Sequence, residues 1–197
     1  CPYMNGDQRA YAKCTVPHCA SGIFNNWETA PWSMEDLDWG LDRISRREIT
    51  LDVALDRQVV TGEGVHCFVI DSGVSTYHEE FQPNRIASQY DVFTGADTQE
   101  DDMGHGTHVA GTMAGNNHGV APGCTIHVVK ALTSTDSDVY TAIEWVVAKM
   151  TEIKQTQPSA RGVVNMSLGG AKGEYWDDWI KMLTDVGLAT VVAAGNE

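Results

Sequence analysis

Three short segments each place a side chain that could take part in catalysis at the end of a predicted strand or the start of a predicted helix. Asp71 follows an apolar run and precedes a glycine turn, His105 lies between two glycines, and Asn196 follows a run of small residues. A carboxylate can orient a histidine, an imidazole can move a proton, and an amide N–H can stabilise a developing oxyanion.

Each segment alone also has an ordinary structural interpretation. An Asp at a strand end often caps a turn, a single His is usually structural or solvated, and Asn196 could mark any strand end. His105 and His108 could suggest a metal-dependent hydrolase. Zinc hydrolases of that kind carry a Glu between two histidines one helical turn apart, and no Glu stands here.

From Gly64 onward, short apolar runs alternate with amphipathic stretches, which predicts an α/β fold: an open parallel sheet with helices on both faces. Strands are predicted at 65–70, 87–93, 125–132, 162–168 and 188–194. Because open parallel sheets build their sites at the carboxyl ends of the strands, the three segments should meet at one edge.

Three helices are predicted to cover this sheet. A helix of small residues should follow His105 and lie close against the strands. The segments 140–157 and 175–186 each carry an apolar stripe at helical spacing, and Gly187 should cap the second in a left-handed conformation. The Trp and Met residues of these stripes are interpreted as core residues that need no cofactor.

Length and composition favour one globular domain. The chain has 197 residues, of which 42% are hydrophobic, and no apolar run long enough to span a membrane. A net charge of −14 argues against a nucleic-acid partner, because phosphate binding needs clustered Lys and Arg. We therefore expect neither a membrane nor a nucleic acid as a partner.

Five cysteines suit an oxidising, secretory compartment with disulfides, although their number is odd and their connectivity cannot be deduced. Cys1, Cys14 and Cys19 fall in an irregular segment, 1–31, which is interpreted as an N-terminal extension preceding a domain at 32–197. Zinc binding by these cysteines with His18 is a weaker alternative, because the spacing matches no standard finger.

The order Asp71, His105, Asn196, with the segments between them, resembles the subtilase family of serine endopeptidases, in which the triad runs Asp, His, Ser along the chain. The resemblance extends from about Trp39 to Glu197. It implies the front part of a subtilisin-like catalytic domain, with the sheet incomplete on its C-terminal side. It also implies that Asp71 orients His105, that His105 is the general base, and that Asn196 is the oxyanion donor.

The resemblance further assigns substrate-binding residues. Ser167, Leu168 and Gly169 would pair with the substrate backbone and form one wall of the specificity pocket, and the segment from Ala193 to Gly195 would form the other. Asp136, Ser137 and Asp138 would lie on an edge strand that binds residues further upstream. Their acidity suggests tolerance for basic residues in the substrate.

The nucleophile of this family lies in a Gly-Thr-Ser-Met-Ala motif, which this sequence does not contain, so the serine is expected after Glu197, on a C-terminal companion segment. The chain alone is then expected to be inactive. The alternative is a non-catalytic relative that binds proteins through the same fold.

The resemblance also bears on cofactors and cysteines. The chemistry requires no cofactor; a structural calcium ion is compatible with the family, with no ligands assigned. Cys67 and Cys124 would begin neighbouring strands, where a disulfide and a pair of buried thiols are both open.

Overall fold

A computed structural model describes residues 39–45, 61–132, 135–170 and 173–195. The predicted extension 1–31, the domain boundary at residue 32 and Asn196 lie outside the described residues. The predictions made for them therefore stay predictions.

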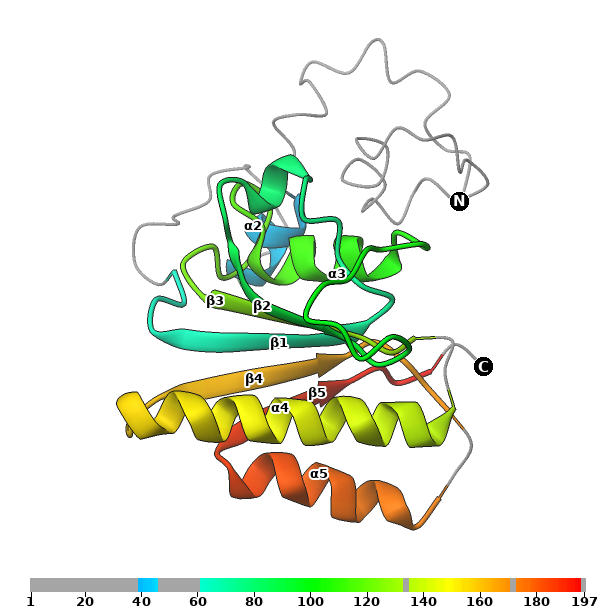
Figure 1. The fold of residues 1–197 in the computed structure, drawn as a ribbon. Coiled ribbons are helices and arrows are strands. Elements are labelled where there is room, and N and C mark those ends of the chain that lie inside the picture. The colour runs from blue at the N-terminus through cyan, green and yellow to red at the C-terminus, as the bar shows by residue number, and fades with distance from the viewer. Residues whose placement is uncertain (1–38, 46–60, 133–134, 171–172, 196–197) are drawn as a thin grey trace, which may run out of the picture.

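Five parallel strands form one sheet (Figure 1). The strands are β1 (Val65–Asp71), β2 (Ile86–Asp91), β3 (Thr125–Lys130), β4 (Arg161–Met166) and β5 (Leu188–Val192). Their order in the sheet is β2-β3-β1-β4-β5, so β1 is the central strand. All five strands predicted from the sequence are confirmed.

Helices cover both faces of this sheet, as predicted (Figure 1). On one side lie α2 (Trp39–Ser45) and α3 (His105–Ala114), and the short 3-10 helix η4 (Glu79–Phe81) precedes β2. On the other side lie α4 (Asp136–Thr156) and α5 (Tyr175–Asp185). No helix in the described ranges has the length and apolar character of a membrane span.

The central strand is buried on both faces because its side chains alternate between two cores. Phe68 and Ile70 pack with the apolar stripes of α4 and α5, whereas Cys67 and Val69 pack with α3 and η4. Gly187 ends α5 with a φ of +82°, the left-handed conformation predicted for it. The predicted helical stripes are thus confirmed as core.

Helix α4 corrects one prediction. Asp136, Ser137 and Asp138 were expected on an edge strand, but they form the first turn of α4, which begins four residues before the predicted Tyr140. The reason is a helix cap: the Asp138 carboxylate accepts the backbone N–H of Thr135 at 2.9 Å and its hydroxyl at 2.8 Å. This local bonding makes α4 begin at Asp136.

Cys67 in β1 and Cys124, which precedes β3, are both buried and are free thiols in this structure. Of the two arrangements that the sequence left open, the structure has the reduced pair. Cys1, Cys14 and Cys19 lie outside the described residues.

Candidate active site

Asp71 and His105 form a hydrogen-bonded pair at the carboxyl edge of the sheet. Nδ1 of His105 lies 2.7 Å from Oδ1 of Asp71, although the two residues are 34 positions apart in sequence. The Asp71 side chain is fully buried, whereas 46% of the His105 side chain is exposed. A buried carboxylate that fixes one nitrogen of an accessible imidazole is the arrangement of an oriented general base.

The carboxylate of Asp71 is fixed from its own strand end. Its Oδ1 also accepts the backbone N–H of Ser72 at 2.7 Å, while Oδ2 is buried and has no hydrogen-bond partner among the described residues. A buried carboxylate oxygen without a partner is costly, and a catalytic role is one of the explanations for such a group.

Two glycines allow the helix to lie against the strand end. A Cβ on Gly106 would stand 2.0 Å from the carbonyl oxygen of Gly73 and 3.1 Å from Cβ of Asp71. Gly73 itself has a φ of +104°, and a Cβ there would meet Gln99 Oε1 at 2.3 Å. Since no larger side chain fits at either position, these glycines bring His105 within reach of Asp71.

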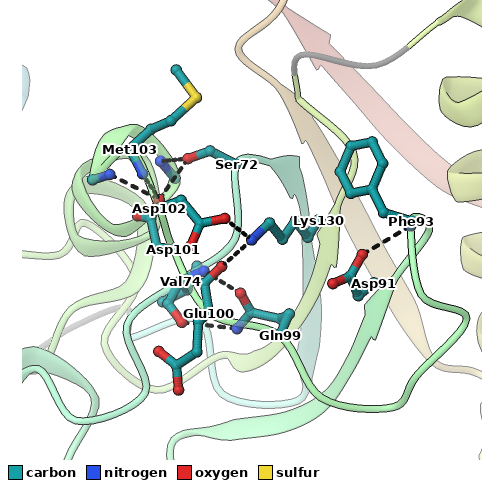
Figure 2. A network of polar contacts seen from close by, with 12 residues as sticks. Ser72, Val74, Asp91, Phe93, Gln99, Glu100, Asp101, Asp102, Met103 and Lys130 are labelled. Carbon is teal, nitrogen blue, oxygen red and sulfur yellow. Dashed lines mark hydrogen bonds and ion pairs between the residues drawn. The ribbon is translucent and has the colours of Figure 1, made fainter.

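The carboxylate of Asp101, which the sequence pattern did not predict as functional, joins these two elements (Figure 2). Its Oδ1 accepts hydrogen bonds from the Ser72 hydroxyl at 2.8 Å and from the backbone N–H groups of Met103 and Gly104 at 3.0 and 2.8 Å. Its Oδ2 accepts the backbone N–H of Thr107 at 2.9 Å and also the Thr107 hydroxyl. Nothing in the acidic run 100–102 distinguishes this residue from its solvated neighbours.

Figure 2 also shows how the segment before His105 is held against the sheet. Gln99 donates to the carbonyl of Val74 at 2.8 Å and accepts the Val74 N–H at 2.7 Å. Lys130, the residue opposite Asp71 on β3, donates to the carbonyl of Glu100 at 2.7 Å and pairs with Asp102. The segment that leads into α3 is therefore anchored to the turn after β1 and to the end of β3.

The two predicted walls of the specificity pocket lie on neighbouring strands. Ser167, Leu168 and Gly169 follow β4, and the segment from Ala193 to Gly195 follows β5, with Met166 opposite Val192. The Ala193 N–H donates to the carbonyl of Met166 at 3.2 Å, so the two segments leave the sheet side by side. The structure thus brings the two predicted walls together.

The acidic turn of α4 also borders this region. A Cβ on Gly170 would lie 3.9 Å from Oδ1 of Asp136. Asp136 also accepts a hydrogen bond from the Tyr175 hydroxyl. Asp136 and Ser137 are exposed, and Asp138 is half-buried, with its carboxylate engaged in the helix cap.

No group of three or more His, Cys, Asp and Glu side chains within the described residues is arranged to hold a metal ion. His108 is half-buried, and its pKa is lowered by burial and by the neighbouring His105. The part of the chain that the structure describes therefore supplies no such ligand set for the metal hydrolase alternative.

The sequence profile of the subtilase family matches residues 62–197. An extracellular serine proteinase of Thermus sp. (strain Rt41A) is 39% identical over 163 residues, and alkaline protease 1 of Aspergillus flavus is 36% identical over 163 residues. Each alignment covers 81% of this chain but only 37% and 38% of those relatives, so the chain spans less than two fifths of their length.

Solved structures show the same fold. A cold-adapted subtilisin-like serine proteinase superposes with a TM-score of 0.69 at 37% identity, covering 80% of this chain and 56% of the other. The CspB protease of Clostridium perfringens superposes with a TM-score of 0.61 at 26% identity, covering 72% of this chain and 38% of the other.

Proposed function

The chain belongs to the subtilase family, and on this premise we propose that it is part of a secreted serine endopeptidase that hydrolyses peptide bonds. The observation that carries the proposal is the contact of 2.7 Å between Nδ1 of His105 and the fully buried Asp71. Secretion is supported by the similarity to the Thermus relative, an extracellular serine proteinase.

In the proposed mechanism, Asp71 accepts the Nδ1–H of His105, which fixes the tautomer that leaves Nε2 free to accept a proton. The exposed part of the imidazole ring would then take the proton of a serine hydroxyl and later give it to the leaving amine. The buried negative charge of Asp71 stabilises the imidazolium that forms between these steps.

The nucleophilic serine is proposed to lie on a segment that follows Glu197 in the full-length protein. Asn196 is proposed to donate its side-chain N–H to the oxyanion, since it directly follows the exposed Gly195 at the carboxyl edge of the sheet. Removal of one such donor costs about 3 kcal/mol of transition-state stabilisation in enzymes that use it.

Substrate is proposed to bind as an extended peptide beside Ser167, Leu168 and Gly169, with its side chain between this segment and the one from Ala193 to Gly195. The side-by-side arrangement of the two segments after β4 and β5 supports this placement. Asp136, Ser137 and Asp138 are proposed to contact residues further upstream from the first turn of α4. The proposed chemistry needs no cofactor.

The test uses the full-length protein with an unfolded protein substrate such as casein. We expect hydrolysis that is abolished by a serine-directed phosphonate and lowered by several orders of magnitude in Asp71→Asn and His105→Ala. Hydrolysis that resists the phosphonate but stops with a chelator would favour the metal hydrolase. A protein that binds the substrate without cleaving it would support the non-catalytic alternative.

A further inference from the structure

We propose that Asp101 is a positioning residue, whose carboxylate holds the first turn of α3, and with it His105, against the end of β1 that carries Asp71. The predicted loss of kcat rests on the proposed function. The predicted role in holding His105 next to Asp71 does not, because it concerns only the position of the helix.

The start of α3 has no cap of its own. Its N-cap residue is Gly104, which has a φ of 78° and offers no side-chain acceptor for the N–H groups of the first turn. Those groups find acceptors outside the helix: the Gly106 N–H donates to the Ser72 hydroxyl at 2.9 Å, and the Thr107 N–H donates to Asp101 at 2.9 Å. The position of His105 therefore depends on side chains that precede the helix.

Two hydroxyl groups link the helix to the segment after β1, and both donate to Asp101. Ser72 Oγ accepts the Gly106 N–H and donates to Oδ1 of Asp101. Thr107 Oγ1 accepts the Ser75 N–H at 2.9 Å and donates to Oδ2 of Asp101. The carboxylate thus orients both hydroxyls so that each presents a lone pair to a backbone N–H of the other element.

The bonding pattern requires an ionised carboxylate, since every one of these contacts is an N–H or O–H donor directed at Asp101. Burial acts to raise the pKa of this carboxyl, but the hydrogen bonds from Thr107, Ser72 and Met103 outweigh burial and lower it. A negative charge beside the first turn of a helix is also favoured by the helix dipole.

Replacement of Asp101 should therefore displace His105 more than it weakens the binding of substrate. The Asp101 carboxylate bonds to Ser72, Met103, Gly104 and Thr107 and not to His105 or Asp71, so its effect must pass through the backbone of the first turn. A displacement of about 1 Å in a catalytic group can lower turnover about 100-fold. A residue that only stabilised the fold would lower the melting temperature without this loss.

The experiment compares Asp101→Ala and Asp101→Asn in the full-length protein with two controls. Asp97→Asn removes a charge at an exposed position four residues before Asp101. Ile143→Val removes one methylene from the core beside α4, far from the contacts of Asp101. It therefore lowers the stability of the protein without changing the candidate active site. The readouts are kcat and KM, and the downfield NMR resonance of the His105 Nδ1 proton.

For Asp101→Ala we expect kcat to fall about 100-fold with little change in KM, and the Nδ1 resonance to broaden or move upfield at a temperature where the protein is still folded. Asp101→Asn, which keeps one acceptor oxygen, should lose less, and both controls should resemble the wild type. An unchanged Nδ1 resonance in both Asp101 variants, or a kcat loss no larger than that of Ile143→Val, overturns the proposal.

If Asp101→Ala does not fold, Asp101→Asn decides alone. A wild type without peptidase activity would refute the proposed function, and the resonance would still decide the role of Asp101.

Discussion

Nδ1 of His66 lies 3.0 Å from Nε2 of His127, which pairs two histidines across the central strands β1 and β3. The side chains are 6% and 4% exposed, and Nδ1 of His127 lies 2.6 Å from the Ser88 hydroxyl on β2. A hydrogen bond between two imidazole nitrogens needs at least one neutral ring, because two imidazolium ions would direct N–H donors at each other. Three adjacent strands thus share a chain of bonds that acid should break.

The first prediction is a loss of stability at mildly acidic pH. Burial, the neighbouring His66 and the Lys149 ammonium of α4 lower the pKa of His127 to about 3. Because the unfolded chain binds this proton near pH 6.5, the unfolded state takes up more protons below that pH, and stability falls as pH drops from 6.5 toward 3. The free energy of unfolding should decrease by about 2 kcal/mol between pH 7 and 5 on account of His127. Urea titrations across this range measure it.

The variant that isolates this effect is His127→Gln, which should flatten the pH dependence. Ser88→Ala serves as the control, because it removes one hydrogen bond and leaves both histidines in place. The pKa of His108 is also lowered, so this histidine also decreases the free energy of unfolding as the pH falls. The effect of His127 is therefore the difference between the pH dependence of the wild type and that of His127→Gln. Identical slopes in the wild type and His127→Gln would contradict the prediction.

A second prediction concerns Glu80, a carboxylate that is 3% exposed and ties η4 to the segment after α3. It accepts the backbone N–H groups of Asn117 and His118 at 2.9 and 3.1 Å and contacts both of their side chains. Glu80→Gln loses charge-assisted bonds and places an amide among donors, so the free energy of unfolding should drop by about 2 kcal/mol.

The neighbouring exposed residue provides the control for Glu80. Glu79→Gln should change the free energy of unfolding by less than about 0.5 kcal/mol, because surface substitutions without special contacts have small effects. Chemical denaturation at neutral pH compares the two variants. Equal stability of Glu80→Gln and Glu79→Gln would show that the buried bonds contribute little.

The elements that the sequence predicted correctly are those that a local pattern determines. The runs of the five strands and the stripes of α4 and α5 follow from hydrophobic periodicity. Asp71 stands at the end of β1, and His105 begins α3. The start of α4 was placed wrongly because the polar run from Thr135 to Asp138 carries no apolar period. It becomes helical through the contact between those two residues.

The residues that the sequence did not predict depend on contacts far along the chain. Asp101 stands in an acidic run that is typical of a solvated loop. Its role depends on a contact with Ser72, which is 29 positions away. Glu80 likewise depends on residues 37 and 38 positions later, and His66 on His127, which is 61 positions away. A buried polar residue cannot be distinguished from an exposed one until its partner is known.

A third prediction concerns specificity and rests on the proposed function. Asp138 is engaged in the cap of α4, so the exposed Asp136 should account for tolerance of basic side chains upstream of the cleaved bond. In the full-length protein, Asp136→Asn should reduce the preference for Lys or Arg about threefold, the effect of one exposed ion pair. A peptide library measures it, with Asp178→Asn on α5 as a control of equal charge. A library cleaved without enrichment of Lys or Arg by the wild type would contradict the prediction.

The last prediction separates two glycines of the same helix, α3. In Gly106→Ala the new Cβ would stand 2.0 Å from the carbonyl oxygen of Gly73, which is backbone and cannot turn aside. The helix must then move away from β1, which carries His105 away from Asp71 and should lower kcat of the full-length protein about 100-fold. In Gly111→Ala the Cβ meets nothing within 4 Å, and the change should stabilise the helix by about 1 kcal/mol. Thermal unfolding and casein hydrolysis, measured on both variants, test this contrast. Full activity in Gly106→Ala would mean that the close approach of α3 to the strand end is not what places His105.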